Sequence, residues 1–297
     1  MEGPPQCRRV TRKPKMAALE IGKLPKLAVV QLDLLLLHEE SDPRRFERLT
    51  QTIASEGCLR NPPIAARDEK TGAYILLDGA NRIGALRNLG ARFVVVQEID
   101  LADSNLSLST WHHAVEGLDI DEGLRRVERF AKVAATVGTF TCDDDFLPNF
   151  RKGWACLIVL PDRTTYAVKG GIDSGQRAAL ARNVFDLISD AANVDRVTYT
   201  SMRDLLRHYP RFSALVCYRP FSKQEVVRFA TDRTLLPGGI TRFCVPKRAL
   251  GFSVPLEFLI ENGPVETKRA TIDRMIQEKI AARRIRFYAE PTFHFDE

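Results

Sequence analysis

One stretch decides how this chain folds: Tyr74-Ile75-Leu76-Leu77-Asp78-Gly79-Ala80-Asn81-Arg82-Ile83-Gly84-Ala85-Leu86-Arg87-Asn88-Leu89-Gly90. It predicts a short buried strand, a sharp turn at Gly79 and an amphipathic helix. Glycine lets bare backbone approach a ligand, and the first helical turn has unpaired N–H groups at the positive end of the helix dipole. Gly79, Ala80, Asn81 and the Arg82 guanidinium are therefore candidate ligands for a phosphate.

Asp78 stands where the predicted strand ends, immediately before the turn. A carboxylate at that position is suited to holding a metal ion or a hydroxyl group beside bound phosphates. The alternative is an ordinary strand-turn-helix connection in which Asp78 only caps the helix. The spacing alone does not separate these two interpretations.

The composition is that of an ordinary globular protein. The chain has 297 residues, of which 44% are hydrophobic and 28% charged, enough for one large or two moderate domains. No run approaches the roughly 20 apolar residues of a membrane span, and no apolar segment follows the basic N-terminus. We therefore expect a cytoplasmic protein without a membrane partner.

Net charge does not favour a nucleic-acid partner. Residues 1–23 hold six Lys or Arg and two Glu, so they contribute +4 of the formal +6 and leave the rest of the chain near +2. The six cysteines are scattered without a C-x-x-C pair, which indicates reduced thiols and not a zinc site. We interpret the run Asp143-Asp144-Asp145 as a solvated loop.

The order of patterns predicts an α+β protein with mixed sheets in two domains. Residues 1–22 have no hydrophobic period and are expected to be a disordered basic tail. The first domain is predicted over residues 23–118. From residue 119 the pattern restarts with a predicted helix over 121–137, so residues 119–297 are predicted to form a second α/β domain.

The elements of residues 24–100 resemble those of the ParB/sulfiredoxin superfamily. A helix begins after Asp42, a strand ends in Asp-Gly, a helix opens on x-Asn-Arg, and a valine-rich strand follows Gly90. Further motifs are similar to the free L-serine kinase branch, which includes the siderophore-associated SbnI type. These are His38-Glu39, Ser109-Thr110-Trp111-His112-His113, and Pro237-Gly238-Gly239-Ile240-Thr241-Arg242-Phe243 followed by Val254-Pro255-Leu256.

Two other branches of the superfamily fit the sequence less well. A sulfiredoxin needs a cysteine where this chain has Ala80. A chromosome-partitioning ParB continues into a helix-turn-helix, whereas the segment after residue 119 is predicted to contain strands and a hairpin. A ParB-like regulator that responds to nucleotide and binds DNA through its basic tail is kept as the alternative function.

The resemblance implies a ParB/sulfiredoxin-like N-terminal domain that binds nucleotide, with the active site in the cleft between the two domains. It implies transfer of a phosphoryl group from ATP or ADP, with Mg²⁺, to the hydroxyl of free L-serine, giving O-phospho-L-serine for a biosynthetic pathway such as that of a siderophore. Glu39 is then the catalytic base, and Asp78 is a second essential acid that also holds the metal. Without the resemblance, Glu39 is an exposed loop residue.

The remaining motifs supply candidate substrate ligands. Trp111 either packs in the core or walls an amino-acid pocket, and His113 matches the W-x-H position of the family. Thr241 and Arg242 follow a Gly-Gly turn, where a guanidinium suits the carboxylate or phosphate of phosphoserine; the alternative for Arg242 is a surface salt bridge.

Asn81 departs from the family pattern, which usually has histidine before the motif arginine. An amide can donate a hydrogen bond to phosphate but cannot carry a charge. We therefore expect either slower turnover or a protein that binds its ligands and has lost much of its kinase activity.

Overall fold

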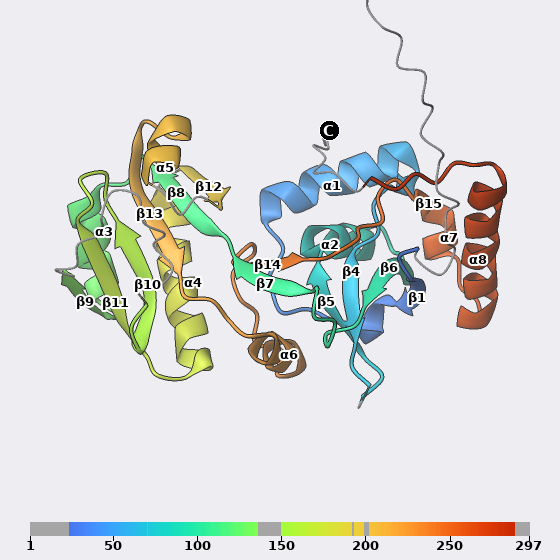
Figure 1. The fold of residues 1–297 in the computed structure, drawn as a ribbon, viewed down its shortest axis with the longest axis horizontal. Helices are drawn as coiled ribbons and strands as arrows, with labels where there is room; N and C mark the ends of the chain where they lie inside the picture. Colours follow the sequence, from blue (N-terminus) through green and yellow to red (C-terminus); the bar gives the residue numbers. More distant parts are fainter. Residues whose placement is uncertain (1–23, 70, 136–149, 192, 199–201, 289–297) are drawn as a thin grey trace, which may run out of the picture.

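The computed structural model describes residues 24–69, 71–135, 150–191, 193–198 and 202–288. The predicted basic tail of residues 1–22 and the run Asp143-Asp144-Asp145 lie outside these ranges. The described residues form a mixed α+β structure built on two sheets that lie side by side along the long axis of the molecule (Figure 1).

The first sheet has five strands in the order β1-β6-β4-β5-β2 and contains both parallel and antiparallel pairs. Its strands are β1 (Leu27–Gln31), β2 (Leu35–Leu36), β4 (Ile64–Arg67), β5 (Tyr74–Asp78) and β6 (Phe93–Ile99). A 3₁₀ turn over Leu32–Leu34 separates β1 from β2, at the place where Asp33 interrupts two apolar runs. The predicted buried strand before Asp78 is β5, whose first four residues are all buried.

The helices around this sheet come from both the early and the late part of the chain (Figure 1). They are α1 (Pro43–Glu56), α2 (Ala80–Asn88), α7 (Leu256–Ile260) and α8 (Val265–Ala281). α1 begins on Pro43, directly after Asp42 as predicted, and is followed by Gly57, whose φ of +64° only glycine adopts easily. Phe252, Val254, Leu259 and Ile272 bury their side chains with residues of β1 and β6.

The second sheet is antiparallel throughout, in the order β12-β8-β13-β10-β11-β9. Its strands are β8 (His112–Glu116), β9 (Lys132–Ala135), β10 (Gly153–Val159), β11 (Thr165–Gly171), β12 (Asn193–Val197) and β13 (Phe212–Tyr218). One face packs against α3 (Ile120–Glu128) and α4 (Ser174–Ala191), and the other contacts α5 (Met202–His208). This part of the described chain is a sheet with helices and not a helix-turn-helix.

Two short strand pairs join distant parts of the sequence. β7 (Ser107–Thr110) pairs with β14 (Thr241–Cys244) between the two sheets, and β3 (Cys58–Leu59) pairs with β15 (Val254–Pro255). α6 (Lys223–Thr231) contributes Val226, Phe229 and Ala230 to a buried cluster that also contains Ile64 and Ile75 of the first sheet. A continuous apolar core therefore connects the two halves of the structure, each of which is built on one of the two sheets.

The predicted helix over 121–137 is wrong in its second half. α3 ends at Glu128, and Lys132–Ala135 forms the edge strand β9, paired with β11. Ala131 and Val133 are apolar at positions that fit the periodicity of a helix or of a strand. Whether this segment forms a helix or a strand therefore depends on pairing with a strand that comes later in the chain.

The division of the chain at residue 119 remains a prediction about folding units, but the packing runs across it twice. β8 precedes residue 119 and belongs to the second sheet, whereas α7 and α8 come last in the chain and pack on the first sheet. The two halves are thus interleaved in sequence.

Candidate active site

A cavity of about 560 Å³ lies where the two halves meet. It is lined by the loop after β2, the end of β5, the start of α2, and residues of β12 and β14. Its charged lining residues are Glu39, Glu40, Arg45, Asp78, Arg82, Arg196, Arg242 and Arg248. Five guanidinium groups against three carboxylates leave an excess of positive charge, and the volume suits a small ligand. The cavity is therefore built for an anion.

The start of α2 forms one wall of the cavity. Gly79 is the N-cap residue at φ +111°, and no side chain caps the helix. A Cβ at Gly79 would lie 3.0 Å from the Cβ of Pro63 and 3.1 Å from the Arg82 guanidinium, so backbone conformation and close packing both require glycine. The first-turn N–H groups, including those of Ala80 and Asn81, have no partner within the helix and line the cavity. This geometry suits a phosphate.

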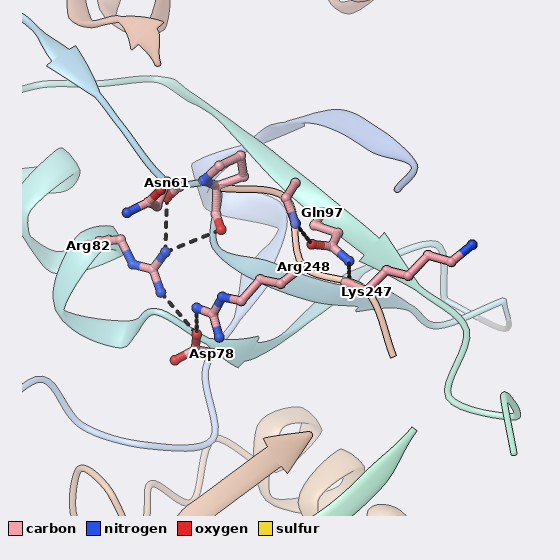
Figure 2. Close-up of polar contacts among 8 residues, drawn as sticks. Asn61, Asp78, Arg82, Gln97, Lys247 and Arg248 are labelled. Atoms are coloured by element: carbon pink, nitrogen blue, oxygen red, sulfur yellow. Dashed lines mark hydrogen bonds and ion pairs between the residues drawn. The ribbon is translucent and has the colours of Figure 1, made fainter. Parts of the chain in front are cut away.

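Asp78 does not cap α2, which removes the alternative interpretation in which Asp78 serves only as a helix cap. Its Oδ2 accepts a hydrogen bond from Arg82 Nη2 at 3.0 Å and another from Arg248 (Figure 2). Burial on its own would raise the pKa of Asp78, but Arg82 and Arg248 outweigh it and lower that pKa below its usual value. Asp78 is therefore a fixed negative charge at neutral pH.

Arg82 and the loop that carries Arg248 are each held by further contacts (Figure 2). Arg82 Nη1 donates to the carbonyl oxygens of Asn61 at 2.9 Å and Pro62 at 3.2 Å. The buried side chain of Gln97 donates to the Lys247 carbonyl at 2.6 Å and accepts from the N–H of Ala249 at 2.8 Å. Gln97 thus fixes the loop that presents Arg248. Sequence reasoning did not identify either Gln97 or Arg248.

Glu39 is bound by the backbone of the Gly-Gly turn. Its Oε2 accepts the N–H of Gly239 at 3.0 Å, and its Oε1 accepts the N–H groups of Ile240 at 3.1 Å and Thr241 at 2.5 Å. The Thr241 hydroxyl adds a bond to Oε1 at 2.6 Å. Oε1 therefore has three donors and Oε2 only one, which leaves Oε2 as the oxygen with capacity for a ligand.

Both glycines of this turn are needed. A Cβ on Gly238 would lie 2.5 Å from the carbonyl oxygen of Glu40. Gly239 has a φ of +83°, and a Cβ there would overlap the Arg196 guanidinium, which donates to the Gly238 carbonyl at 3.0 Å. Arg196 comes from β12 and was not identified from the sequence.

His38 lies behind Glu39 and is only 3% exposed. Its Nδ1 is 2.8 Å from the Leu76 carbonyl oxygen, and its Nε2 is 2.7 Å from the Thr241 hydroxyl oxygen. Burial lowers the pKa of His38, and the nearby charge of Glu39 offsets only part of that effect. The Thr241 hydroxyl bonds to Glu39 and His38, and Thr241 also lines the cavity, so its role in binding substrate stays a prediction.

Asn81 connects α2 to the loop that carries Glu39. Its side-chain oxygen accepts the N–H of Asp42 at 2.7 Å, and the neighbouring Ser41 hydroxyl donates to the Ala80 carbonyl at 2.9 Å. The amide nitrogen of Asn81 remains the part of the side chain that is suited to phosphate.

Trp111 and Arg242 lie together on the cavity wall. The Arg242 guanidinium carbon is 5.0 Å from the centre of the Trp111 ring, a cation–π arrangement. The backbone N–H of Trp111 donates to the Ile240 carbonyl at 2.9 Å, so the turn that binds Glu39 also positions Trp111. Arg242 is thus stacked on an aromatic ring at the cavity.

His113 does not line the cavity. It is 1% exposed, its Nδ1 is 3.0 Å from the Tyr218 hydroxyl, and its ring packs against Phe185 and Tyr218. Burial lowers the pKa of His113 to about 3, with a contribution from Arg196. The structure therefore places His113 in the core, although the sequence motif predicted that it binds substrate.

Comparison with known proteins shows a consistent set of relatives, although no family model matches the chain. The chain is 27% identical over 247 residues to the ATP-dependent L-serine kinase SbnI of Staphylococcus aureus, covering 82% of this chain and 87% of that protein. It is 26% identical over 251 residues to an ATP-dependent L-serine kinase of Staphylothermus marinus, covering 80% and 97%. An ADP-dependent L-serine kinase of Thermococcus kodakarensis is 20% identical over 232 residues, covering 77% and 91%.

Solved structures agree on the fold. SbnI of S. aureus with a C-terminal truncation superimposes with a TM-score of 0.68 at 24% identity, over 86% of this chain and 97% of the other. A free serine kinase in complex with AMP superimposes with a TM-score of 0.66 at 18% identity, over 78% and 93%. Among the described residues, no helix combines the length and apolar character needed to cross a membrane.

Proposed function

Since the chain belongs to the free serine kinase family of the SbnI type, we propose that it transfers a phosphoryl group from a nucleotide to the hydroxyl of L-serine, giving O-phospho-L-serine. The observation that carries the proposal is the Glu39 carboxylate, held by the backbone of residues 239–241 at the edge of an arginine-lined cavity. A carboxylate beside an anion site is what an alcohol acceptor needs for phosphoryl transfer.

The donor nucleotide binds at the start of α2. The N–H groups of Ala80 and Asn81, with the Arg82 and Arg248 side chains, surround the place where its phosphates lie. We assign the first sheet with α1 and α2 to the ParB/sulfiredoxin-like part of the protein. The nucleotide then occupies the cleft between this part and the second sheet.

Glu39 is the general base. The Oε2 atom takes the proton of the serine hydroxyl, the serine oxygen forms the new bond to phosphorus, and the bond from phosphorus to the leaving nucleotide oxygen breaks. The negative charge passes to the leaving phosphate, where the guanidinium groups of Arg82 and Arg248 stabilise it. General-base catalysis of this kind contributes about 100- to 10,000-fold in rate.

The serine binds between Trp111, Arg242 and the Gly-Gly turn. The guanidinium of Arg242 is held against the Trp111 ring and faces the cavity, so it can pair with the amino-acid carboxylate. Arg196 is fixed by the Gly238 carbonyl next to Glu39 and supplies a second positive charge near the reacting groups.

Asp78 is the residue of this site that is best suited to magnesium. No group of three or more His, Cys, Asp or Glu side chains suited to a metal occurs among the described residues. Mg²⁺ commonly binds one or two carboxylates together with substrate phosphates and water, and Asp78 is an ionised carboxylate beside the proposed phosphate site. When bound, the metal neutralises phosphate charge; Asp78 is the residue that would hold it.

The proposal is tested by incubating the purified protein with MgCl₂, L-serine and either ATP or ADP, and detecting O-phosphoserine by mass spectrometry and ³¹P NMR. L-alanine, which has the same backbone without the hydroxyl, is the matched control. We expect O-phosphoserine with at least one nucleotide and no nucleotide consumption with L-alanine. Absence of O-phosphoserine with both nucleotides would contradict the assignment. The product then supplies a biosynthetic pathway, which the resemblance associates with siderophores.

A further inference from the structure

A buried hydrogen-bonded chain lies behind the proposed base. It runs from the Leu76 carbonyl to His38 Nδ1 at 2.8 Å, from His38 Nε2 to Thr241 Oγ1 at 2.7 Å, and from Thr241 Oγ1 to Glu39 Oε1 at 2.6 Å. His38 is 3% exposed and Thr241 8% exposed, so water does not substitute for these contacts. These bonds connect the proposed catalytic carboxylate to His38, a buried titratable group that is among the residues lining the same cavity.

Few hydrogen atoms are available to this series of hydrogen bonds. A carbonyl only accepts, so His38 Nδ1 carries a hydrogen, and Nε2 of the neutral ring can only accept. Burial lowers the pKa of His38, which favours the neutral ring. The single hydroxyl proton of Thr241 therefore stands between two acceptors, Nε2 of His38 and Oε1 of Glu39.

The charge of Glu39 decides which acceptor receives that proton. While Glu39 is ionised, its carboxylate is the stronger acceptor and the hydroxyl donates to Oε1. When Oε2 is protonated, Oε1 becomes a neutral oxygen that still accepts two backbone N–H groups. The Thr241 hydroxyl can then turn to Nε2 of His38 without breaking its own O–H bond.

We propose that His38 is a positioning residue for phosphoryl transfer, which receives the Thr241 hydroxyl bond when Glu39 takes up the proton of the acceptor hydroxyl. This inference rests on the proposed kinase function. Four hydrogen bonds reach the ionised carboxylate, and the buried Thr241 hydroxyl would lose a strong acceptor once Glu39 is protonated. By accepting the Thr241 hydroxyl after the proton transfer, His38 stabilises the protonated Glu39 side chain relative to its ionised form.

Other charges around this chain come from five elements. They are Glu40 in the loop after β2, Arg45 on α1, Asp78 on β5, Arg196 on β12 and Arg242 on β14. All five groups are present in every variant compared below, so they contribute the same field to each. A change in pH dependence caused by His38 is therefore separable from their contribution.

The first experiment compares His38→Asn with His38→Gln. Asparagine can still donate to the Leu76 carbonyl but is too short to reach Thr241, whereas the glutamine amide reaches the position of Nε2. One hydrogen bond corresponds to about half to one pH unit, so His38→Asn should move the acid limb of the kcat profile down by that amount. The value of kcat should fall about 3- to 10-fold, with KM little changed. His38→Gln should recover at least half of both effects.

The second experiment repeats the substitution in a Thr241→Val background. Without the hydroxyl the two groups are disconnected, so His38→Asn should cause no further shift of the acid limb. A shift that persists in this background, or an unchanged acid limb in His38→Asn alone, would overturn the inference and leave His38 a structural residue.

The third experiment does not depend on kinase activity. Protein labelled with ¹³C at the glutamate carboxyl carbons allows the Glu39 signal to be assigned by comparison with Glu39→Gln and titrated by NMR. His38→Asn should lower the titration midpoint of Glu39 by about half to one pH unit. This result supports the coupling even if no O-phosphoserine is formed, and an unchanged midpoint overturns it even if serine is phosphorylated.

Discussion

Replacing Gly239 with alanine tests the geometry of the turn that holds Glu39. The residue has a φ of +83°, and an added Cβ would overlap the Arg196 guanidinium. A left-handed conformation costs a non-glycine residue about 1–2 kcal/mol. The overlap adds to this cost, because Arg196 is already fixed to the Gly238 carbonyl and either the side chain or the turn must move.

Gly72→Ala is the matched control for Gly239→Ala. Gly72 has a similar φ of +72°, but no heavy atom lies within 4 Å of the position of its Cβ. It therefore carries the backbone strain without the overlap and is remote from Glu39. We expect both variants to lose roughly 2–6 °C in melting temperature, with the larger loss at Gly239.

Turnover should separate the two variants. Because the N–H of Gly239 donates to Glu39 Oε2, movement of the turn displaces the proposed base, and a displacement of about 1 Å can cost 100-fold in rate. O-phosphoserine formation should fall by about 100-fold in Gly239→Ala and stay within about twofold in Gly72→Ala. Equal turnover in the two variants, at equal melting temperatures, would refute the reasoning.

Three further predictions concern Asp78, Asn81 and His113. Asp78→Asn removes the partner of two guanidinium groups. Isothermal titration should show that the variant binds nucleotide about tenfold more weakly than the wild type with Mg²⁺, and more tightly than the wild type without Mg²⁺. The same change in affinity under both conditions would argue against a metal role for Asp78. Asn81→His should preserve or raise nucleotide affinity, because one imidazole nitrogen can accept the Asp42 N–H while the other donates to phosphate. Complete loss of nucleotide binding would mean that the start of α2 is not the phosphate site. The pKa of His113 is about 3 in the folded protein, below the ordinary 6.5, so the unfolded chain binds the extra proton between these values and stability falls as pH drops through 6.5. Between pH 7 and 5 this amounts to about 2 kcal/mol, which urea unfolding should detect and His113→Phe should abolish.

Local patterns in the sequence predicted most of the elements around the site. Apolar alternation, the Asp-Gly turn and the proline at the start of α1 each act over a few residues, and β5, α2 and α1 have nearly the predicted bounds. The strand β9 was missed because its conformation depends on pairing with β11, which comes later in the chain. The packing of α8 on the first sheet is likewise set by contacts between the two ends of the chain.

The candidate site was predictable where a motif surrounded the residue. Glu39, Asp78 and Trp111 lie in conspicuous segments and line one cavity. Arg196 and Arg248 are single basic residues, and nothing nearby in the sequence distinguishes them from exposed surface charges.

His113 lies near Trp111 in sequence but not on the cavity. It belongs to β8, whereas Trp111 precedes that strand, and the His113 side chain packs in the core against Phe185 and Tyr218. Proximity in the sequence therefore did not predict which residues share a site.

A single-turnover comparison of the wild-type protein with Glu39→Gln tests whether Glu39 is the general base. Nucleotide-saturated protein is mixed with L-serine and quenched over time, and O-phosphoserine is quantified; Glu40→Gln, the same substitution one residue further along the loop, is the control. We expect transfer to be at least 100-fold slower in Glu39→Gln and less than tenfold slower in Glu40→Gln, with similar nucleotide affinity in all three proteins. Transfer by Glu39→Gln at more than about a tenth of the wild-type rate would contradict the assignment of Glu39 as the base.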